Sequence, residues 1–268
     1  MKFNNKIVLI TGGASGIGKI MGRLALERGA EALVIWDINV ANIEATKSEY
    51  GALGRVVGYQ VNVADSEAVA AAYGRVKSEV GDVDILINCA GIVRGNRTFD
   101  RQSVEDIRLT MDINVTACMV VALQVLPDMI ARNSGHICNI ASAAGMLSLP
   151  KMSVYAASKW AVIGWSDSVR IELQQMHSAV RITTIAPYFI NTGMFDGVRS
   201  RLFPILDPER TSRKIVRAIE HNRDFRGLPF GFHFIRFWQG VLPVTVFDFL
   251  FGKCCGIYSV MDHFTGRR

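Results

Sequence analysis

Several patterns that would assign this chain to other classes of protein are missing from it. Its net charge is only +6, and it has no long basic run interleaved with aromatic residues, which argues against nucleic acid as a partner. Its five cysteines are odd in number and lack metal-ligand spacing. We therefore expect neither a metal site nor a disulfide framework, but reduced thiols in a cytoplasmic protein.

The sequence also leads us to expect no leader segment. The N-terminal residues lead directly into the first expected strand, which leaves no room there for a signal peptide or an anchor. The aromatic stretch 225–251 is interrupted by polar and charged residues before it reaches the roughly eighteen apolar residues of a transmembrane helix. We expect no transmembrane helix, and a peripheral membrane contact stays open.

What the sequence does contain is an alternation of short apolar strands with helical segments. This pattern is typical of repeated strand–helix–strand units and predicts one α/β domain over 1–268, a doubly wound parallel sheet of about seven strands (a Rossmann fold) with a C-terminal helical extension. Two long helices, at about 103–131 and 153–176, are apolar around much of their circumference, which predicts a homodimer or homotetramer. The expected strands are 6–11, 32–36, 55–61, 84–88, 135–140, 180–186 and 225–230.

A glycine-rich turn follows the first strand. Four glycines fall within seven residues, and a helical pattern begins directly after them. Glycines allow a tight turn and let the backbone and the helix N-terminus approach a pyrophosphate, so this context predicts a dinucleotide site rather than a plain loop. The turn residues expected to bind the cofactor are Gly12, Ser15, Gly16, Ile17 and Gly18.

Asp37 ends the second expected strand, roughly twenty residues beyond the turn. An acidic group there can accept hydrogen bonds from the ribose hydroxyls of NAD, and it would repel the extra phosphate of NADP. The alternative is that Asp37 only caps the helix that starts near Val40. We favour NAD as the cofactor.

Tyr155 and Lys159 lie four residues apart on a predicted helix, so the two side chains share one face. A phenol titrates near pH 10, and a cation held beside it favours the phenolate, so the pair predicts proton transfer. The spacing alone is a weak signal. It gains weight from the glycine turn and from Ser142, which precedes the tyrosine in the sequence.

Together these residues resemble the classical short-chain dehydrogenase/reductase family over residues 6–192. The turn at 11–18, the segment 88–91 and the loop with Pro187 and Thr192 are similar to its cofactor-binding motifs. The resemblance implies the further cofactor-binding residues Asn62, Val63, Asn88, Ala90, Gly91, Tyr155, Lys159, Pro187 and Thr192. It implies a catalytic tetrad formed by Asn114, Ser142, Tyr155 and Lys159.

The family resemblance also implies a role for each member of the tetrad. Tyr155 would transfer a proton to or from the substrate oxygen, Lys159 would lower the tyrosine pKa and bind the nicotinamide ribose, and Ser142 would hydrogen-bond the reacting oxygen. Asn114 would distort its helix and hold a water that relays protons to Lys159. The chain departs from the family pattern at three positions: Asn62, Cys89 and Tyr188.

The C-terminal part resembles the retinol and hydroxysteroid dehydrogenase branch of the family. This implies an apolar, extended substrate such as a retinoid, a steroid or a long-chain alcohol or aldehyde. The alternatives are a small polar substrate (a polyol, a hydroxy acid or a 3-oxoacyl thioester) and a non-catalytic dinucleotide sensor. We expect segment 194–251 to form a substrate lid with Gly193 and Gly197 as pivots and with the apolar residues Met194, Phe195, Leu202 and Phe203. Its aromatic tail could instead be ordinary core, a subunit interface or a surface anchor.

Overall fold

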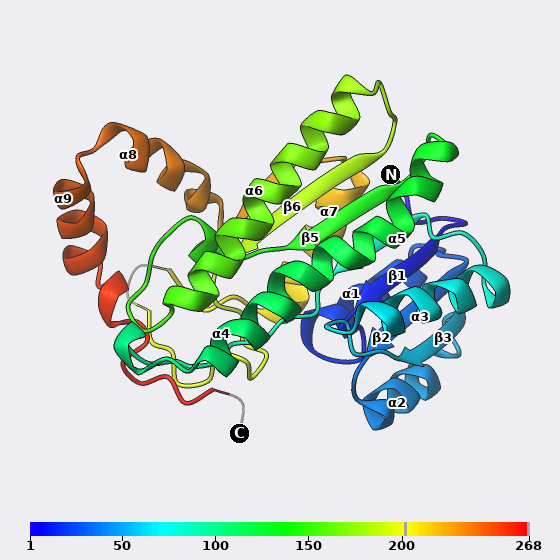
Figure 1. The fold of residues 1–268 in the computed structure, drawn as a ribbon, viewed down its shortest axis with the longest axis horizontal. Coiled ribbons are helices and arrows are strands. Elements are labelled where there is room, and N and C mark those ends of the chain that lie inside the picture. Colours follow the sequence, from blue (N-terminus) through cyan, green and yellow to red (C-terminus); the bar gives the residue numbers. More distant parts are fainter. Residues whose placement is uncertain (201–202, 267–268) are drawn as a thin grey trace.

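The computed structural model describes residues 1–200 and 203–266 and contains one seven-stranded parallel sheet with helices on both faces (Figure 1). The strand order is β3-β2-β1-β4-β5-β6-β7, so the expected doubly wound fold is confirmed. The strands are β1 (Ile7–Thr11), β2 (Ala32–Asp37), β3 (Arg55–Gln60), β4 (Ile85–Asn88), β5 (His136–Ile140), β6 (Arg181–Pro187) and β7 (Phe225–Leu228).

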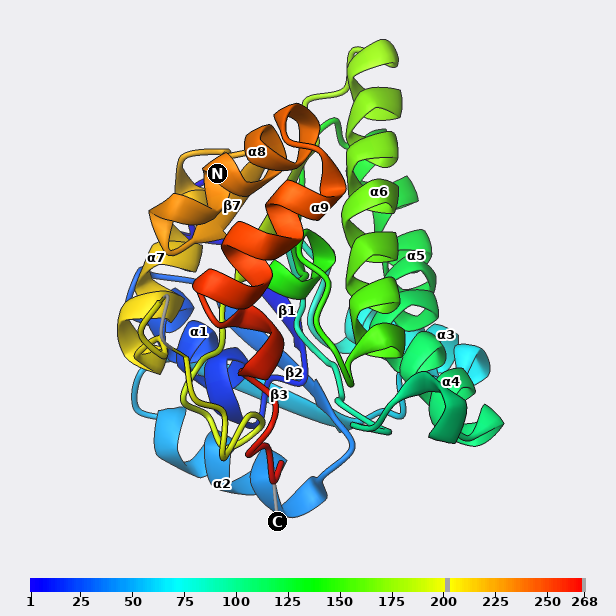
Figure 2. The same ribbon diagram turned by 90° about the vertical axis from the view of Figure 1, so that its left-hand side faces the viewer.

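The helices cover the two faces of the sheet in separate layers (Figure 2). One apolar cluster joins α1, α2 and α7 to one face, and a second joins α3, α5 and the C-terminal part of α6 to the other. The main helices are α1 (Gly16–Leu26), α2 (Val40–Tyr50), α3 (Ser66–Glu79), α4 (Val104–Met111), α5 (Ala117–Ala131), α6 (Ser153–Gln175) and α7 (Pro208–Glu220).

The chain reverses its direction of travel across the sheet between β1 and β4. It moves outward from β1 to β2 and β3, and then returns to place β4 on the other side of β1. Thr11 pairs with Asn88 at the ends of these two strands. In an open parallel sheet, such a switch point leaves a crevice at the carboxyl ends of the strands, which is where ligands bind.

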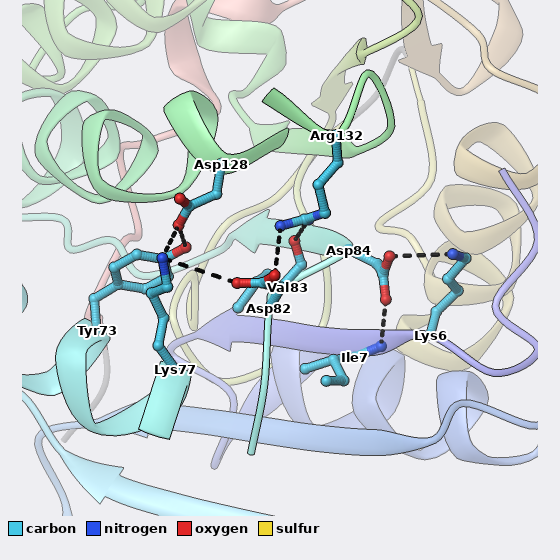
Figure 3. Close-up of polar contacts among 9 residues, drawn as sticks. All are labelled: Lys6, Ile7, Tyr73, Lys77, Asp82, Val83, Asp84, Asp128 and Arg132. Carbon is cyan, nitrogen blue, oxygen red and sulfur yellow. Dashed lines mark hydrogen bonds and ion pairs between the residues drawn. The ribbon is translucent and has the colours of Figure 1, made fainter. Parts of the chain in front are cut away.

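Polar contacts at the opposite, amino-terminal edge of the sheet hold β4 against its neighbours (Figure 3). The Asp84 carboxylate accepts hydrogen bonds from Lys6 Nζ at 3.1 Å and from the Ile7 amide at 3.0 Å. Arg132, after α5, donates to the Val83 carbonyl at 2.9 Å. These contacts lie far from the crevice and hold the start of β4 in register with β1.

A second part of the same region ties α3 to α5. Asp128 on α5 accepts hydrogen bonds from the Tyr73 hydroxyl at 2.6 Å and from Lys77 Nζ at 2.9 Å, both on α3. The hydrogen bond from Tyr73 is the largest influence that lowers the pKa of Asp128, and the hydrogen bond from Lys77 is the next. The two helices are thus joined by a charge-assisted bond as well as by apolar packing.

Among the described residues, one helical stretch, Val104–Ala131, is long and apolar enough to cross a membrane by length and composition. It comprises α4, a π-helical turn (Asp112–Thr116) and α5. Its apolar side chains pack against α3 and the sheet, with Val121, Val125 and Met129 fully buried. This packing is that of a core helix of the domain.

The expected lid, 194–251, is divided by the fold into parts with different roles. α7 packs against α1, and β7 pairs with β6 in the sheet, so both belong to the body of the domain. The loop after β6 is the part that lies over the crevice. Its two ends are joined by a β-bridge between Ile190 and Leu206. Leu202 lies outside the described residues.

The C-terminal extension expected from the sequence is helical. It contains α8 (Ile235–Val241), α9 (Val244–Phe247) and a π-helical continuation (Asp248–Cys254). In Figures 1 and 2 these helices stand outside the helix–sheet–helix layers, next to the N-terminal half of α6. Short 3₁₀ turns complete the described structure at Phe99–Arg101, Ala143–Gly145, Phe230–Phe234 and Ile257–Ser259.

We predict that the exposed apolar side chains of α5 and α6 form a contact between two subunits. Leu123 on α5 is 68% exposed, and Trp160 and Ile171 share one face of α6. Light scattering at micromolar concentration should give about twice the 29.6 kDa chain mass. Leu123→Arg combined with Ile171→Arg should lower that mass to one chain, and a wild-type monomer would contradict the prediction.

Candidate active site

The glycine turn between β1 and α1 adopts a backbone that only glycine fits. Gly12 has φ +65°, and a Cβ atom there would lie 3.0 Å from Ala90 Cα. A Cβ atom on Gly18 would lie 2.2 Å from the Gly12 carbonyl oxygen. The turn therefore packs on the backbone that follows β4 at Gly12 and on itself at Gly18, and a side chain at either position would push these segments apart.

The N-terminus of α1 opens toward this turn. Among the described residues, no side chain caps it, because Ser15 makes no capping hydrogen bond. By contrast, Asn39 caps α2 and Asp65 caps α3. An uncapped N-terminus leaves backbone N–H groups and the positive end of the helix dipole available to an anion.

A pocket of about 860 Å³, partly open to solvent, lies between the glycine turn and the N-terminal part of α6. It brings together most of the residues expected from the sequence. Those that line it are Gly12, Ser15, Gly16, Ile17, Gly18, Ala90, Gly91, Ser142, Tyr155, Lys159, Pro187 and Thr192.

Asp37, Asn62 and Val63 lie at the carboxyl ends of β2 and β3, beyond the lining of this pocket. The Asp37 carboxylate accepts hydrogen bonds from the backbone of Ala14, in the glycine turn, and of Asn39, each at 3.1 Å. The residue that caps α2 is Asn39, so the capping role considered for Asp37 is wrong. Asn62 is exposed, and its side chain accepts a hydrogen bond from the Ala64 amide.

Tyr155 and Lys159 are both buried in the first turns of α6, and both line the pocket. Lys159 Nζ lies 5.7 Å from the centre of the Tyr155 ring and donates to the Ile140 carbonyl at 3.0 Å. Ser142 follows β5, and its hydroxyl accepts a hydrogen bond from the Ala144 amide at 3.1 Å. The ends of β5 and α6 thus carry three polar groups to one wall of the pocket.

Burial controls the ionisation of these groups. It raises the pKa of Tyr155 to about 12, while a hydrogen bond with Ser142 acts in the opposite direction. Burial also lowers the pKa of the Lys159 ammonium. The sequence led us to expect a lowered tyrosine pKa from the neighbouring lysine, but removal from water is the largest influence on the tyrosine pKa in this pocket.

Asn114 lies beneath the pocket, at the centre of the π-helical turn. In this turn the Ala117 amide bonds to the Asp112 carbonyl, five residues back, which is the local helix distortion expected at Asn114. The fully buried Asn114 side chain accepts from the Ile92 amide at 2.8 Å and donates to the Ile92 carbonyl at 3.0 Å. Its Oδ1 atom and Lys159 Nζ both face Gly91.

Asn88 is placed below the pocket floor rather than in its lining. Its side-chain amide donates to the Asn139 side chain at 2.9 Å and to the Cys118 carbonyl at 3.2 Å. Asn139 in turn donates to Ser166 on α6. This buried chain of amides fixes the end of β4 relative to β5 and α6.

Several pocket residues were not expected from the sequence. The Ile140 carbonyl, which holds Lys159, is a backbone group that any residue would supply. Ile190 belongs to no sequence motif. It lines the pocket because the loop after β6 folds back where Ile190 forms its β-bridge. Cys89 and Tyr188, noted only as departures from the family pattern, both line the pocket.

The arrangement joins an anion-binding helix end to a buried phenol, ammonium and hydroxyl. These residues fit a nicotinamide dinucleotide, because the close-packed glycines leave room for a pyrophosphate and the polar groups lie at the other end of the same pocket. Such a cofactor supplies a hydride donor or acceptor when it is bound. The fold and site thus define a dinucleotide-dependent oxidoreductase.

Comparison with known families identifies the chain more closely. The family described as short chain dehydrogenase matches residues 6–202, and the chain belongs to this family. Epidermal retinol dehydrogenase 2 of Mus musculus is 37% identical over 270 residues, which cover 98% of this chain and 86% of that protein. Estradiol 17-beta-dehydrogenase 11 of Homo sapiens is 33% identical over 240 residues, or 89% and 79% of the two chains.

Solved structures agree with the fold. A short chain dehydrogenase/reductase from Burkholderia phymatum in complex with NAD has a TM-score of 0.77 and 25% identity, with 90% of this chain and 95% of that chain covered. An NAD⁺-bound xylitol dehydrogenase has a TM-score of 0.76 and 23% identity, with 85% and 99% covered, and supports the fold alone. The protein is an oxidoreductase of alcohols that uses a nicotinamide dinucleotide.

Proposed function

We propose that the protein is an NAD-dependent dehydrogenase/reductase that interconverts an extended apolar alcohol and its carbonyl compound. The substrate class is a retinoid, a steroid or a long-chain alcohol or aldehyde. The observation that carries this proposal is the lining of a second, narrow pocket, which shares Ser142 and Tyr155 with the cofactor pocket. Its other lining residues are aromatic or aliphatic: Ala143, Ala144, Leu147, Leu149, Tyr188, Phe189 and Phe195.

This lining favours hydrocarbon over a polyol. Apart from the two shared groups, the only polar atom among the lining side chains is the Tyr188 hydroxyl, and it already hydrogen-bonds Ser200 at 2.8 Å. A bound polyol would leave hydroxyl groups without partners, at a cost that a hydrocarbon chain avoids. The names of the retinol and estradiol dehydrogenases among the relatives support the same class.

The proposed roles follow from the positions of the side chains. Tyr155 donates a proton to the carbonyl oxygen in reduction and accepts it back in oxidation. Ser142, which hydrogen-bonds Tyr155, holds the same substrate oxygen. Lys159 binds the nicotinamide ribose next to the phenol. The Asn114 side chain hydrogen-bonds the backbone of Ile92 and so holds the loop after β4 near Lys159.

The location of Asp37 supports NAD as the preferred dinucleotide. Its carboxylate is fixed on the backbone of the glycine turn, so its negative charge stays beside the position of the adenosine ribose. A second phosphate on that ribose would meet a like charge, which is unfavourable. The solved short chain dehydrogenase/reductase at 25% identity was obtained with NAD, and this agrees with the proposal.

The loop after β6 supplies a cover for the reacting groups. Phe195 lies edge-to-face on Tyr155, with ring centres 6.0 Å apart, and together with Met194 it lines the cofactor pocket. Gly193 and Gly197 both have φ +84°, and a Cβ atom on Gly197 would lie 2.0 Å from the His263 carbonyl. Gly193 thus remains the better pivot, because Gly197 is held by the C-terminal segment. The cover keeps water from the hydride-transfer site.

We expect Tyr155→Phe to lower kcat by about 10²–10⁴-fold, the usual contribution of a general acid/base group. NADH affinity, measured by fluorescence titration, should stay nearly unchanged. Tyr50→Phe, at a buried tyrosine on the other side of the sheet, is the matched control and should keep full activity. Because burial raises the Tyr155 pKa, wild-type alcohol oxidation should also accelerate with pH through about pH 10, while reduction stays level near neutrality. Retention of more than about a tenth of kcat by Tyr155→Phe would contradict the assignment.

Cofactor choice should depend on Asp37. Wild-type kcat/KM for NAD should exceed that for NADP by more than about tenfold, since like charges placed side by side are strongly unfavourable. Asp37→Ala combined with Ile38→Arg should reduce or invert this ratio, because residue 38 is exposed and an arginine there can reach a phosphate. Ile38→Ala alone should leave the ratio unchanged. Equal kcat/KM for the two cofactors in the wild type would overturn the proposal.

Substrate chain length should raise kcat/KM for primary and secondary alcohols, since each buried CH₂ contributes about 0.8 kcal/mol. Met194→Ser combined with Phe195→Ser should flatten this dependence, and NAD affinity is measured alongside it because both residues also line the cofactor pocket. Ile205→Ser, at an exposed residue of the same loop, serves as the control. If kcat/KM is level or falls with chain length, and polyols are better substrates, the small polar substrate becomes the correct class.

A further inference from the structure

Tyr188 lines both the cofactor pocket and the apolar pocket, and it is one of the three positions at which the chain departs from the family pattern. It directly follows β6, and its backbone amide donates to the Leu228 carbonyl at 2.7 Å, at the end of β7. The side chain is buried. A large side chain therefore starts from a fixed point at the edge of the sheet and reaches both pockets.

The Tyr188 ring is held from behind by other aromatic rings. Its centre lies 5.3 Å from that of Phe232, which is fully buried in the 3₁₀ turn after β7, and 5.7 Å from that of Phe203. Both distances are those of aromatic pairs in contact. Because protein interiors are closely packed, the Tyr188 ring cannot retreat from the pockets without displacing these neighbours.

The Tyr188 hydroxyl is held as well. It hydrogen-bonds Ser200 at 2.8 Å, and the Ser200 hydroxyl also accepts a hydrogen bond from the Phe203 amide at 3.3 Å. The loop that carries Ser200 is tied to the C-terminal segment, since the Thr265 amide donates to the Asp196 carbonyl at 2.9 Å. Figure 2 shows this loop, in yellow, beside the C-terminal segment in red.

Tyr188 ends a row of four aromatic rings that begins at the reacting phenol, and we call this row the aromatic wall. The ring centres are 6.0 Å apart for Tyr155 and Phe195, 5.0 Å for Phe195 and Phe189, and 4.7 Å for Phe189 and Tyr188. Each ring thus touches the next, and the row is closed along its length. All four rings line the apolar pocket, whose other lining residues belong to the loop after β5.

This wall limits the width of what can approach Tyr155 and Ser142. A hydroxyl on an open chain brings only the width of one carbon chain to the reacting groups, whereas a hydroxyl on fused rings brings the rings with it. To admit the wider group, Tyr188 would have to leave its aromatic neighbours and break its hydrogen bond with Ser200, both of which are unfavourable.

We propose that Tyr188 is a specificity-determining residue, whose ring narrows the apolar pocket so that alcohols on an open chain react in preference to alcohols on fused rings. The inference rests on the proposed function, because it requires an apolar substrate whose oxygen reaches Tyr155. It assigns to Tyr188 the shape of the pocket and not the transfer of the proton.

The test compares two secondary alcohols, decan-2-ol and estradiol, at saturating NAD. Wild-type kcat/KM should be higher for decan-2-ol by more than about tenfold, since small differences of fit in an apolar pocket change selectivity by about 10–200-fold. Tyr188→Leu removes the ring but keeps an apolar side chain, and it should reduce this preference by about tenfold or more through a gain in kcat/KM for estradiol. Tyr188→Met, which fills more of the vacated space, is measured beside it and should shift the preference in the same direction.

Two control variants separate the width of the pocket from other effects. Tyr188→Phe keeps the ring and loses the bond with Ser200, so the preference should stay within about threefold of the wild type. Phe247→Leu removes a ring that is buried in the same apolar cluster but lines neither pocket, and it should leave the preference unchanged. A merely structural role of Tyr188 would lower kcat/KM for both alcohols together. NAD affinity, measured by fluorescence titration, reports any effect on the cofactor pocket separately.

The inference and the proposed function fail in different ways. A wild type that prefers estradiol, a preference that stays the same in both Tyr188→Leu and Tyr188→Met, or an equal shift in Phe247→Leu would overturn the role of Tyr188. If kcat/KM rises with alcohol chain length while one of these results is found, the apolar-substrate proposal stands without it. Turnover of polyols in preference to both decan-2-ol and estradiol would overturn the proposed function and the role of Tyr188 together.

Discussion

The site depends on the hydroxyl of Thr11, which joins the ends of two neighbouring strands. Thr11 ends β1, and its Oγ1 atom accepts hydrogen bonds from the Cys89 amide at 3.0 Å and the Ala90 amide at 3.1 Å, just after β4. These bonds hold the segment after β4 against the glycine turn, where a Cβ atom on Gly12 would already be too close. The crevice at the switch point exists because these two backbones are kept at contact distance.

From this point the polar groups are placed by buried contacts that continue across the sheet. Asn88 is bonded to Asn139, Asn139 to Ser166 on α6, and Asn114 to Ser158 near the start of the same helix. Burying amides is unfavourable unless they find partners, so each bond restricts the position of α6 relative to the strands. Tyr155 and Lys159 are carried on the helix that these contacts fix.

The sequence predicted the parts of the fold and site that depend on local pattern. Runs of apolar residues located all seven strands, and the close glycines located the turn because few other residues tolerate that backbone. The spacing of Tyr155 and Lys159 placed both in one pocket, since four residues on a helix return to the same face. The capping role of Asp37 could be rejected only once Asn39 was seen to cap α2.

Features that arise from long-range packing could not be predicted in this way. The raised pKa of Tyr155 reflects burial by loops distant in sequence, which a local pattern does not reveal. The expected lid contained α7 and β7 because an amphipathic helix and a short strand give no sign of whether they pack on the sheet or over the crevice. Ile190 lines the pocket because of its β-bridge to Leu206, and no sequence motif predicts this bridge.

Phe195 lines both the cofactor pocket and the apolar pocket, and it rests on the ring of Tyr155. It also contacts Phe189 and Phe264, so one aromatic side chain joins the loop, the end of β6 and the C-terminal segment. A ligand that holds Phe195 in this position would obstruct the exit from the cofactor pocket and from the apolar pocket at once. We therefore expect the residence time of the dinucleotide to depend on the aromatic loop as well as on the glycine turn, so that the departures of the two ligands are linked in time.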